Sequence, residues 1–399
     1  MSNYKPYPSC KDSGVERIGE VPEHWDVMAF KRLASIRNGQ EFKGVADPNG
    51  NYPVFGSGGE FARASSYIFN GESVLLGRKG TVDKPLYVSG PFWTVDTMFY
   101  TEIADKAFPK FVYYCALTIP FSLYSTNTAL PSMTGEDISS HVLAAPKYAE
   151  QQAIAAAIDR ETARIDALIA KKTRFVELLR EKIVAMASQP FDSPNIRWVR
   201  LSHVCDVISR PVLQQPGCSY TKLGLFNRGR GIFKRDETDA EDMGDSEFFW
   251  VQPSDLILSG QFAWEGAVAL ANEDHDECVV SHRFPVIRGR AQEALTEYLF
   301  AYFLTSHGNF VLNDCSRGSA GRNRPLNMNL LLGSKIPIPS MQIQLQITQL
   351  VRLERQIGRT VNRSIDLLRE RRSAFITAAV TGKIDLRDDL LSASEVKEQ

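Results

Sequence analysis

Basic residues set in glycine-containing turns are the features of this sequence most suited to chemistry with a ligand. Arginine fits guanine edges and phosphates, asparagine and glutamine fit adenine, and glycine lets a backbone approach a duplex closely. A single basic turn is more often only a solvated surface, but such turns recur at corresponding places in two halves of the chain. We therefore predict DNA contacts from Ser57, Gly58, Arg78, Lys79, Thr94, Asn127, Arg228, Arg230, Lys234, Arg317, Arg322 and Arg324.

Catalytic motifs are missing from the sequence. There is no GxxxxGK[ST] string for a nucleotide motor and no Asn-Pro-Pro-aromatic string typical of a methyltransferase. The run 274–278 contains potential metal ligands, but a contiguous acidic run is typical of a hydrated turn. The six cysteines lack CxxC spacing, which favours reduced and mostly buried thiols. We expect no catalytic residue, no metal site and no cofactor in this chain.

The composition is that of an ordinary soluble globular protein, with 43% hydrophobic and 23% charged residues. A net charge of −1 excludes a basic protein that coats DNA nonspecifically, although it allows a local basic patch. No apolar run approaches the roughly 20 residues of a membrane span. The N-terminus lacks the apolar core of a signal peptide, so we expect a cytoplasmic protein.

An internal duplication organises these turns. Residues 146–183 resemble residues 339–372, with Pro146 matching Pro339, Gln151 matching Gln344, and four extra residues in the first copy. A tryptophan followed by an R-L-x-x-I/V string precedes each half, at Trp25 and at Trp198. Units of this length are too long for a solenoid, so the sequence predicts two similar domains.

The two matching segments carry apolar residues at heptad-like spacing. Such stripes, flanked by charges, predict two long helices packed as an antiparallel coiled coil, with an ordinary pair of core helices as the alternative. The first helix would measure roughly 60 Å at about 1.5 Å per residue. The predicted spacer or partner-binding residues are Ile158, Ile165, Leu168, Phe175, Leu179, Ile357, Val361, Leu368 and Phe375.

The region that precedes each helix mixes short apolar runs with turns, which predicts an α+β fold. Strands are expected at 52–59, 73–80 and 92–100 and a helix at 108–124, with counterparts at 255–260, 279–284 and 294–306. The predicted divisions are an N-terminal segment 1–24, a first recognition domain 25–148, helix 149–189, linker 190–196, a second recognition domain 197–340, helix 341–380 and tail 381–399.

Over nearly its full length the chain resembles the specificity subunits of type I restriction-modification systems. The matching strings are Ile18–Trp25, Tyr52–Gly59, Gly77–Gly80, Phe92–Thr97, Glu150–Ile154 and Ala379–Ile384, although Gly77–Gly80 has no clear equivalent in the second half. The resemblance implies two target-recognition domains that read a split, asymmetric DNA target across a helical spacer. It also implies modification methyltransferase subunits and restriction translocase/nuclease subunits as partners, with S-adenosylmethionine, ATP and magnesium bound by those partners.

Two other functions remain open at this stage. The chain could be a stand-alone DNA-modifying enzyme, which activity of the purified chain would reveal. It could also be a coiled-coil scaffold without DNA affinity, which salt-sensitive binding to duplex DNA would exclude.

Overall fold

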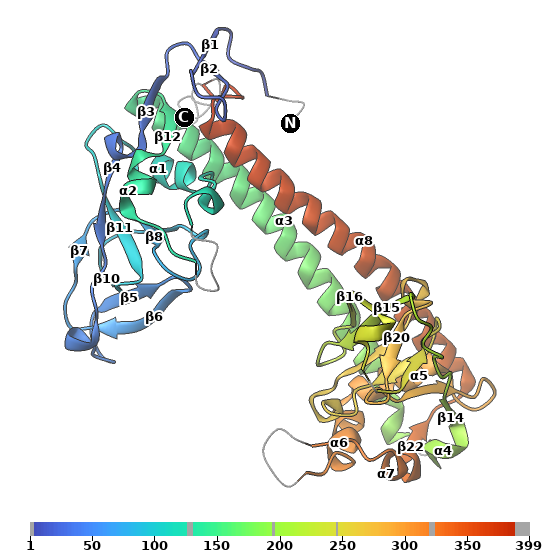
Figure 1. The fold of residues 1–399 in the computed structure, drawn as a ribbon. Coiled ribbons are helices and arrows are strands. Elements are labelled where there is room, and N and C mark those ends of the chain that lie inside the picture. Colours follow the sequence, from blue (N-terminus) through green and yellow to red (C-terminus); the bar gives the residue numbers. More distant parts are fainter. Residues whose placement is uncertain (1–3, 126–130, 194–195, 245, 319–323, 388–399) are drawn as a thin grey trace, which may run out of the picture. The chain divides into compact units, whose positions relative to one another are not determined.

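The computed structural model describes residues 4–125, 131–193, 196–244, 246–318 and 324–387. The chain forms two compact units, of residues 1–170 with 365–399 (unit 1) and of residues 171–364 (unit 2). Each unit contains an α+β domain and part of each of two long helices, α3 (Tyr148–Ser188) and α8 (Met341–Val380) (Figure 1). The predicted fold class of two α+β domains, each followed by a long helix, is confirmed.

The domain of unit 1 contains two four-stranded sheets. One has the antiparallel order β4-β11-β8-β9, and the other has the order β6-β5-β10-β7 with β5 and β10 parallel. The elements are β1 (Cys10–Asp12), β2 (Glu20–Pro22), β3 (Asp26–Ala29), β4 (Ala34–Asn38), β5 (Tyr52–Gly56), β6 (Gly59–Ala64), β7 (Phe69–Asn70), β8 (Ser73–Gly77), β9 (Leu86–Val88), β10 (Pro91–Thr94), β11 (Met98–Ile103), α1 (Pro109–Ala116), α2 (Gly135–Ser140) and β12 (Val142–Ala145).

Unit 2 repeats this topology strand for strand. Its sheets have the orders β14-β21-β18-β19 and β16-β15-β20-β17, with β15 and β20 parallel. The elements are β13 (Arg197–Arg200), α4 (Leu201–Val204), β14 (Cys205–Ile208), β15 (Ser219–Leu225), β16 (Ile232–Asp239), β17 (Phe248–Trp250), β18 (Leu256–Leu258), β19 (Val268–Leu270), β20 (Val279–Ser281), β21 (Val286–Gly289), α5 (Thr296–Leu304), α6 (Ser306–Asp314), α7 (Met328–Gly333) and β22 (Lys335–Ile338).

Two details of the predicted repeat are wrong. The single strand expected at 92–100 is two strands, because a turn closed by the Met98 N–H and the Val95 carbonyl (3.0 Å) carries the chain from one sheet to the other. The tryptophans are not equivalent either. The strand pairings show that Val27, and not Trp25, occupies the position in unit 1 that is equivalent to Trp198 in unit 2. Trp25 is fully buried and donates to Glu150 Oε1 (3.1 Å), whereas Trp198 is exposed.

Each domain is fastened to the start of its long helix by a buried glutamine. In unit 1, Gln151 Oε1 accepts from the Phe108 N–H (2.8 Å) and Nε2 donates to the Pro146 carbonyl (2.9 Å). In unit 2, Gln344 accepts from the Leu295 N–H (2.9 Å) and donates to the Pro339 carbonyl (3.0 Å). The matching Gln and Pro of the sequence repeat therefore form the same structural joint twice.

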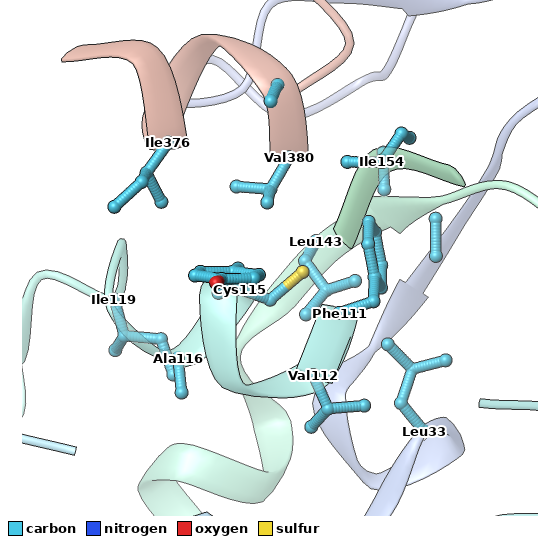
Figure 2. Packing of buried hydrophobic residues seen from close by; sticks show 14 of the residues in the cluster. Leu33, Phe111, Val112, Cys115, Ala116, Ile119, Leu143, Ile154, Ile376 and Val380 are labelled. Carbon is cyan, nitrogen blue, oxygen red and sulfur yellow. The ribbon is translucent and has the colours of Figure 1, made fainter. Parts of the chain in front are cut away.

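The core of unit 1 continues from the domain into both helices. Figure 2 shows Phe111 and Cys115 of α1 facing Ile154 of α3 and Ile376 and Val380 of α8, all buried. α8 ends at Val380, and Gly382, two residues later, has a φ of +70° that favours glycine; a Cβ there would come within 2.3 Å of Pro22 Cδ. The end of α8 is thus packed against the N-terminal segment of the chain.

The two long helices pack as an antiparallel pair. α3 begins and α8 ends in unit 1, whereas α3 ends and α8 begins in unit 2. In each unit, a buried glutamate forms an ion pair with an arginine of the facing helix. Glu161 pairs with Arg371 (2.7 Å), and Glu354 pairs with Arg180 (2.8 Å). Buried residues recur along both helices, many of them three, four or seven residues apart as in coiled coils. This buried seam includes Ile154, Ile158, Thr162, Ile165, Val176, Ile183, Ile347, Val351, Glu354, Val361, Ile365, Phe375 and Ala379.

The seam corrects part of the predicted spacer set. Leu168 and Phe175 are 40% and 48% exposed, because the seam uses the next residue in each case, Ile169 and Val176. Apolar residues at both adjacent positions made the sequence ambiguous by one residue. Of the other predicted spacer residues, the structure buries Ile158, Ile165, Val361 and Phe375 and half-buries Leu179, Ile357 and Leu368. None of the described helices is long and apolar enough to cross a membrane.

Candidate nucleic-acid interface

In unit 1, three loops converge on the connection between β10 and β11. The Arg78 N–H donates to the Thr97 carbonyl (2.9 Å), the Gln40 N–H to the Thr94 carbonyl (3.0 Å), and the Val95 N–H to the Phe55 carbonyl (3.2 Å). The loop after β8, the segment after β4 and the end of β5 are therefore held around residues 94–97. This arrangement brings the predicted Gly77–Gly80 loop close to the strand that leads into the Ser57-Gly58 turn.

Four of the predicted side chains in unit 1 have the accessibility that a DNA contact needs. Lys79 and Gly58 are exposed, and Ser57 and Arg78 are half-buried. The Arg78 guanidinium lies over the Phe99 ring at 5.9 Å and donates to the Asp96 carbonyl (3.3 Å). Lys79 forms no ion pair within the described residues, so its charge is available to an external anion.

Thr94 is wrong as a predicted DNA contact. It is fully buried, and its hydroxyl donates to the Phe55 carbonyl (3.1 Å), so it supports the β5–β10 pairing. Alternation along the strand turns the preceding residue, Trp93, toward the other face, where its indole N–H donates to the Gln40 carbonyl (3.0 Å). Two further predicted contacts, Asn127 and Arg322, lie outside the described residues.

Unit 2 has the same convergence with different side chains. The Gly260 N–H donates to the Arg283 carbonyl (2.7 Å), as the Arg78 N–H does to Thr97. Gly77–Gly80 therefore does have an equivalent in the second half, and it is residues 259–262, with the sequence Ser-Gly-Gln-Phe. Leu326 joins the same place, since its N–H donates to the Gly260 carbonyl (2.8 Å).

A cavity of about 670 Å³ opens at this place in unit 2. Three cationic side chains line it, Lys222 and Arg235 from the β15–β16 hairpin and Arg283 after β20, and none forms an ion pair within the described part of the chain. Gln261 and Phe262 line it from the loop after β18, and both are exposed. Unpaired cations beside an exposed amide and an aromatic ring can bind phosphates and base edges.

None of these five residues, Lys222, Arg235, Gln261, Phe262 and Arg283, is among the DNA contacts predicted from the sequence. Single cations on separate strands carry no local signal, because only the sheet brings them together. One signal was present, however. Residues 255–260 were already matched to the strand that precedes Arg78 and Lys79, so the next residue, Gln261, occupies the equivalent place.

The predicted arginines of unit 2 are divided among several locations. Arg228 and Arg230 line a different cavity from Arg283, and Lys234 lies on the face of β16 opposite to Arg235. Arg317 pairs with Asp314 (3.4 Å) at the end of α6. Arg324 lies over the Trp264 ring at 5.1 Å and donates to Asn313 Oδ1 (2.5 Å) and to the Ser316 carbonyl (3.2 Å), so it ties loop 316–326 to the loop after β18.

A buried carboxylate paired with two arginines lies at the start of β18. Asp255 is fully buried and accepts from Arg210 Nη1 (2.7 Å), from Arg288 Nε (2.6 Å) and from the Gln252 N–H (2.8 Å). Unit 1 has uncharged groups at the equivalent place, where the buried Ser73 hydroxyl donates to the Thr101 carbonyl (2.7 Å). The two domains thus share a scaffold and differ in the side chains on it.

The described residues do not include a constellation suited to metal catalysis. No group of three or more His, Cys, Asp or Glu side chains among them could hold a metal ion. All six cysteines are free, and burial raises the pKa of Cys205 to about 11, so that thiol is protonated and unreactive near neutral pH. His275, within the acidic run, uses Nδ1 to accept from the Asn272 N–H (3.1 Å).

Comparisons with known proteins agree with this geometry. Residues 22–178 match the type I restriction modification DNA specificity domain. Among solved structures, the chain is similar to the S subunit of a type I restriction-modification system from M. genitalium, with 13% identity, coverage of 89% of this chain and 96% of that chain, and a TM-score of 0.50. It is also similar to a chain from a structure of complex assembly and conformational transition in the type I R-M system, with 15% identity, coverage of 91% and 99%, and a TM-score of 0.58.

A search of curated protein sequences found no match. The family domain covers the first recognition domain and most of α3, and the second half repeats the same strand topology and the same glutamine joint. Residues 22–178 therefore belong to the family of type I restriction modification DNA specificity domains, and the chain has the fold of the two solved structures.

Proposed function

We propose that the chain is the DNA-specificity subunit of a type I restriction-modification complex and reads an asymmetric, two-part DNA target, with one half-site for each recognition domain. The observation that carries the proposal is the equivalence of the loops after β8 and β18. Each loop is held by a backbone hydrogen bond, the first to the connection between β10 and β11 and the second to the connection between β20 and β21. The first loop nevertheless presents Arg78 and Lys79, whereas the second presents Gln261 and Phe262. Different side chains at equivalent places favour different base sequences in the two half-sites.

The helix pair gives this proposal its spacing element. Buried ion pairs at Glu161 and Glu354 fix the register of α3 against α8, because a one-residue slip would leave a buried carboxylate unpaired. A fixed register would hold a fixed number of base pairs between the half-sites, as protein geometry sets half-site spacing in dimeric DNA-binding proteins.

The chemistry would belong to partners. Modification subunits would methylate an adenine in each half-site using S-adenosylmethionine, and restriction subunits would supply ATP- and magnesium-dependent translocation and cleavage. Exposed apolar side chains on α3, Phe175 and Leu178 (48% and 47% exposed), offer a docking surface to a modification subunit. The chain itself would act as a non-catalytic subunit.

The test is the binding of duplex DNA by the chain assembled with its modification subunit. We expect a split sequence preference and an affinity that falls steeply with salt. Binding without sequence preference would contradict the reading function, and methylation by the chain alone would favour a stand-alone enzyme.

A further inference from the structure

Unit 2 contains a second cavity, of about 350 Å³, that shares no lining residue with the proposed reading cavity. The segment 228–232, α5 and both long helices contribute to it. Its apolar wall consists of Ile183, Ile232, Leu270, Phe300, Phe303 and Leu304. A volume of this size, with apolar walls and a few convergent polar groups, is typical of a small-molecule site, for which about 300–1,000 Å³ is usual.

The polar lining of this cavity is strongly cationic. It contains Arg180, Arg228, Arg230, Arg355 and Arg359, and its one carboxylate, Glu354, is paired with Arg180 at 2.8 Å. Arg359 pairs with Asp274 at 3.4 Å outside the lining. Arg228, Arg230 and Arg355 form no ion pair within the described residues.

Arg355 is the least exposed arginine in this lining and has no directly paired carboxylate within the described residues. It is half-buried, and its guanidinium donates to the Leu270 carbonyl (3.0 Å) rather than to a carboxylate. Burial, together with the neighbouring Arg359, lowers the pKa of Arg355. Burial and Arg355 also lower the pKa of His275 to about 4, so that imidazole is neutral at pH 7. A half-buried guanidinium without a directly paired carboxylate has lost part of its hydration, and a bound anion would compensate for that loss.

The repeat in unit 1 shows which residues create the cavity. At the same spacing from the anchoring glutamines, Gly358 stands where unit 1 has the buried Ile165, Arg355 where it has Thr162, and Arg359 where it has Asp166. Gly358 lines the cavity in the middle of α8, although glycine there costs about 1 kcal/mol relative to alanine. Unit 2 has thus lost a side chain and gained cations at the positions that unit 1 fills.

One of the arginines that line this cavity, Arg228, has a strained backbone conformation. Arg228 has φ +57°, a left-handed conformation that costs a non-glycine residue on the order of 1–3 kcal/mol. The strand-to-loop contacts hold it there, since the Arg228 N–H donates to the Glu265 carbonyl (3.1 Å) and the Gly229 N–H to the Gly266 carbonyl (2.9 Å). A Cβ on Gly229 would come within 2.3 Å of Leu304 Cδ2, so the loop lies tightly against the apolar wall.

We propose that this cavity binds a nucleoside phosphate, with the phosphate among Arg228, Arg230 and Arg355 and the base against Phe300 and Phe303. Guanidinium groups bind phosphate oxygens through paired hydrogen bonds. The aromatic wall accepts a planar ring, and Asn272, Asn309 and Asn362 in the lining supply donors and acceptors for its edge. This site is independent of DNA reading, although Asn227, beside Arg228, lines the other cavity.

Calorimetric titration of the full chain with AMP, adenosine and inorganic phosphate tests the proposal. AMP is expected to bind at least about tenfold more tightly than either fragment, because it engages both the arginines and the apolar wall. Gly358→Ile, which restores the side chain that unit 1 carries, and Arg355→Thr are each expected to weaken AMP binding by about tenfold or more. The matched control Arg369→Ala alters an exposed arginine of α8 that is paired only locally with Asp366 (3.1 Å), and it should leave AMP binding unchanged.

Circular dichroism and melting of each variant show whether the fold is retained, and Arg355→Thr keeps the test informative where Gly358→Ile distorts the helix. Equal binding of AMP by the wild type and both cavity variants overturns the proposal. Phosphate binding as tight as AMP removes the role of the apolar wall and overturns it too. If AMP does not bind and Arg355→Thr weakens duplex binding, the nucleotide proposal is overturned, and the cavity instead binds a backbone phosphate of DNA. Duplex binding that is normal alongside AMP binding supports a separate site.

Discussion

Replacing three cations of the reading cavity, Lys222, Arg235 and Arg283, by glutamine should weaken the salt dependence of DNA binding. All three line the same cavity and lack ion pairs within the described residues, so each is available to a phosphate. Neutralising a phosphate contact changes the slope of log K against log salt by about 0.9, so losing all three changes it by up to about 2.7. Glutamine retains hydrogen bonding and much of the side-chain length, which limits the change to charge.

The slope translates into a measurable factor. Between 50 and 200 mM salt, a slope difference of about 2.7 means that the wild type loses about 40-fold more affinity than the triple variant. Fluorescence anisotropy with a duplex that contains the target, in the complex with the modification subunit, measures both slopes. Arg290→Gln serves as the control, because Arg290 already pairs with Asp206 (2.8 Å) in the same unit.

Two results would refute this reasoning. An unchanged slope in the triple variant would mean that the cavity does not meet the phosphate backbone. A slope change as large in Arg290→Gln would mean that net charge, and not the cavity, governs the binding.

Three further predictions concern stability and assembly. Asp255→Ala should destabilise unit 2 by about 3 kcal/mol, because it leaves two half-buried arginines without their shared buried carboxylate, and it should lower the Tm of unit 2 by about 6–12 °C in calorimetry. Ser73→Ala, its uncharged counterpart, should cost about 1 kcal/mol, and equal costs would contradict the account. Burial lowers the pKa of His141 from 6.5 to about 4, so unit 1 should lose stability as the pH falls from about 6.5 towards 4, and His141→Asn should abolish that loss in pH-dependent melts. Phe175→Ser should alter stability by less than about 0.5 kcal/mol yet weaken capture of the modification subunit, and unchanged capture would remove Phe175 from the docking surface.

The repeat in the sequence predicted the architecture well because both copies of the helix carry the same joint. Gln151 and Gln344 make matching hydrogen bonds, so similarity of sequence at these positions reflects an identical structural demand. The α+β fold followed from short apolar runs between turns, and strand β5, β8 and helix α1 lie within the predicted ranges.

The seam register could not be fixed from one helix. Leu168 and Ile169 are both apolar and adjacent, and only the facing helix decides which is buried. Thr94 misled for a related reason. A polar residue at a strand end can face solvent or can pair with a neighbouring carbonyl, and the position of Phe55 decides in favour of pairing.

The reading cavity escaped prediction because its residues are distant in the sequence. Lys222 and Arg283 belong to separate segments that meet only because β15 and β20 are paired in parallel. Clusters such as Arg228–Arg230 stand out in a sequence, but the loop that carries them turns toward a different cavity. Adjacency along the chain was therefore a poor guide to which cations act together.

The central claim, that each recognition domain reads one half of a split target, is tested most directly by mapping methylated adenines in cells. The wild-type chain would be compared with Gln261→Ala/Arg283→Ala in unit 2 and with Lys79→Gln in unit 1, each expressed with the modification subunit. We predict that the unit 2 variant relaxes or abolishes only one half of the motif, that the unit 1 variant affects only the other half, and that the gap between them keeps its length. Changes in both halves from a variant in one unit would contradict the claim.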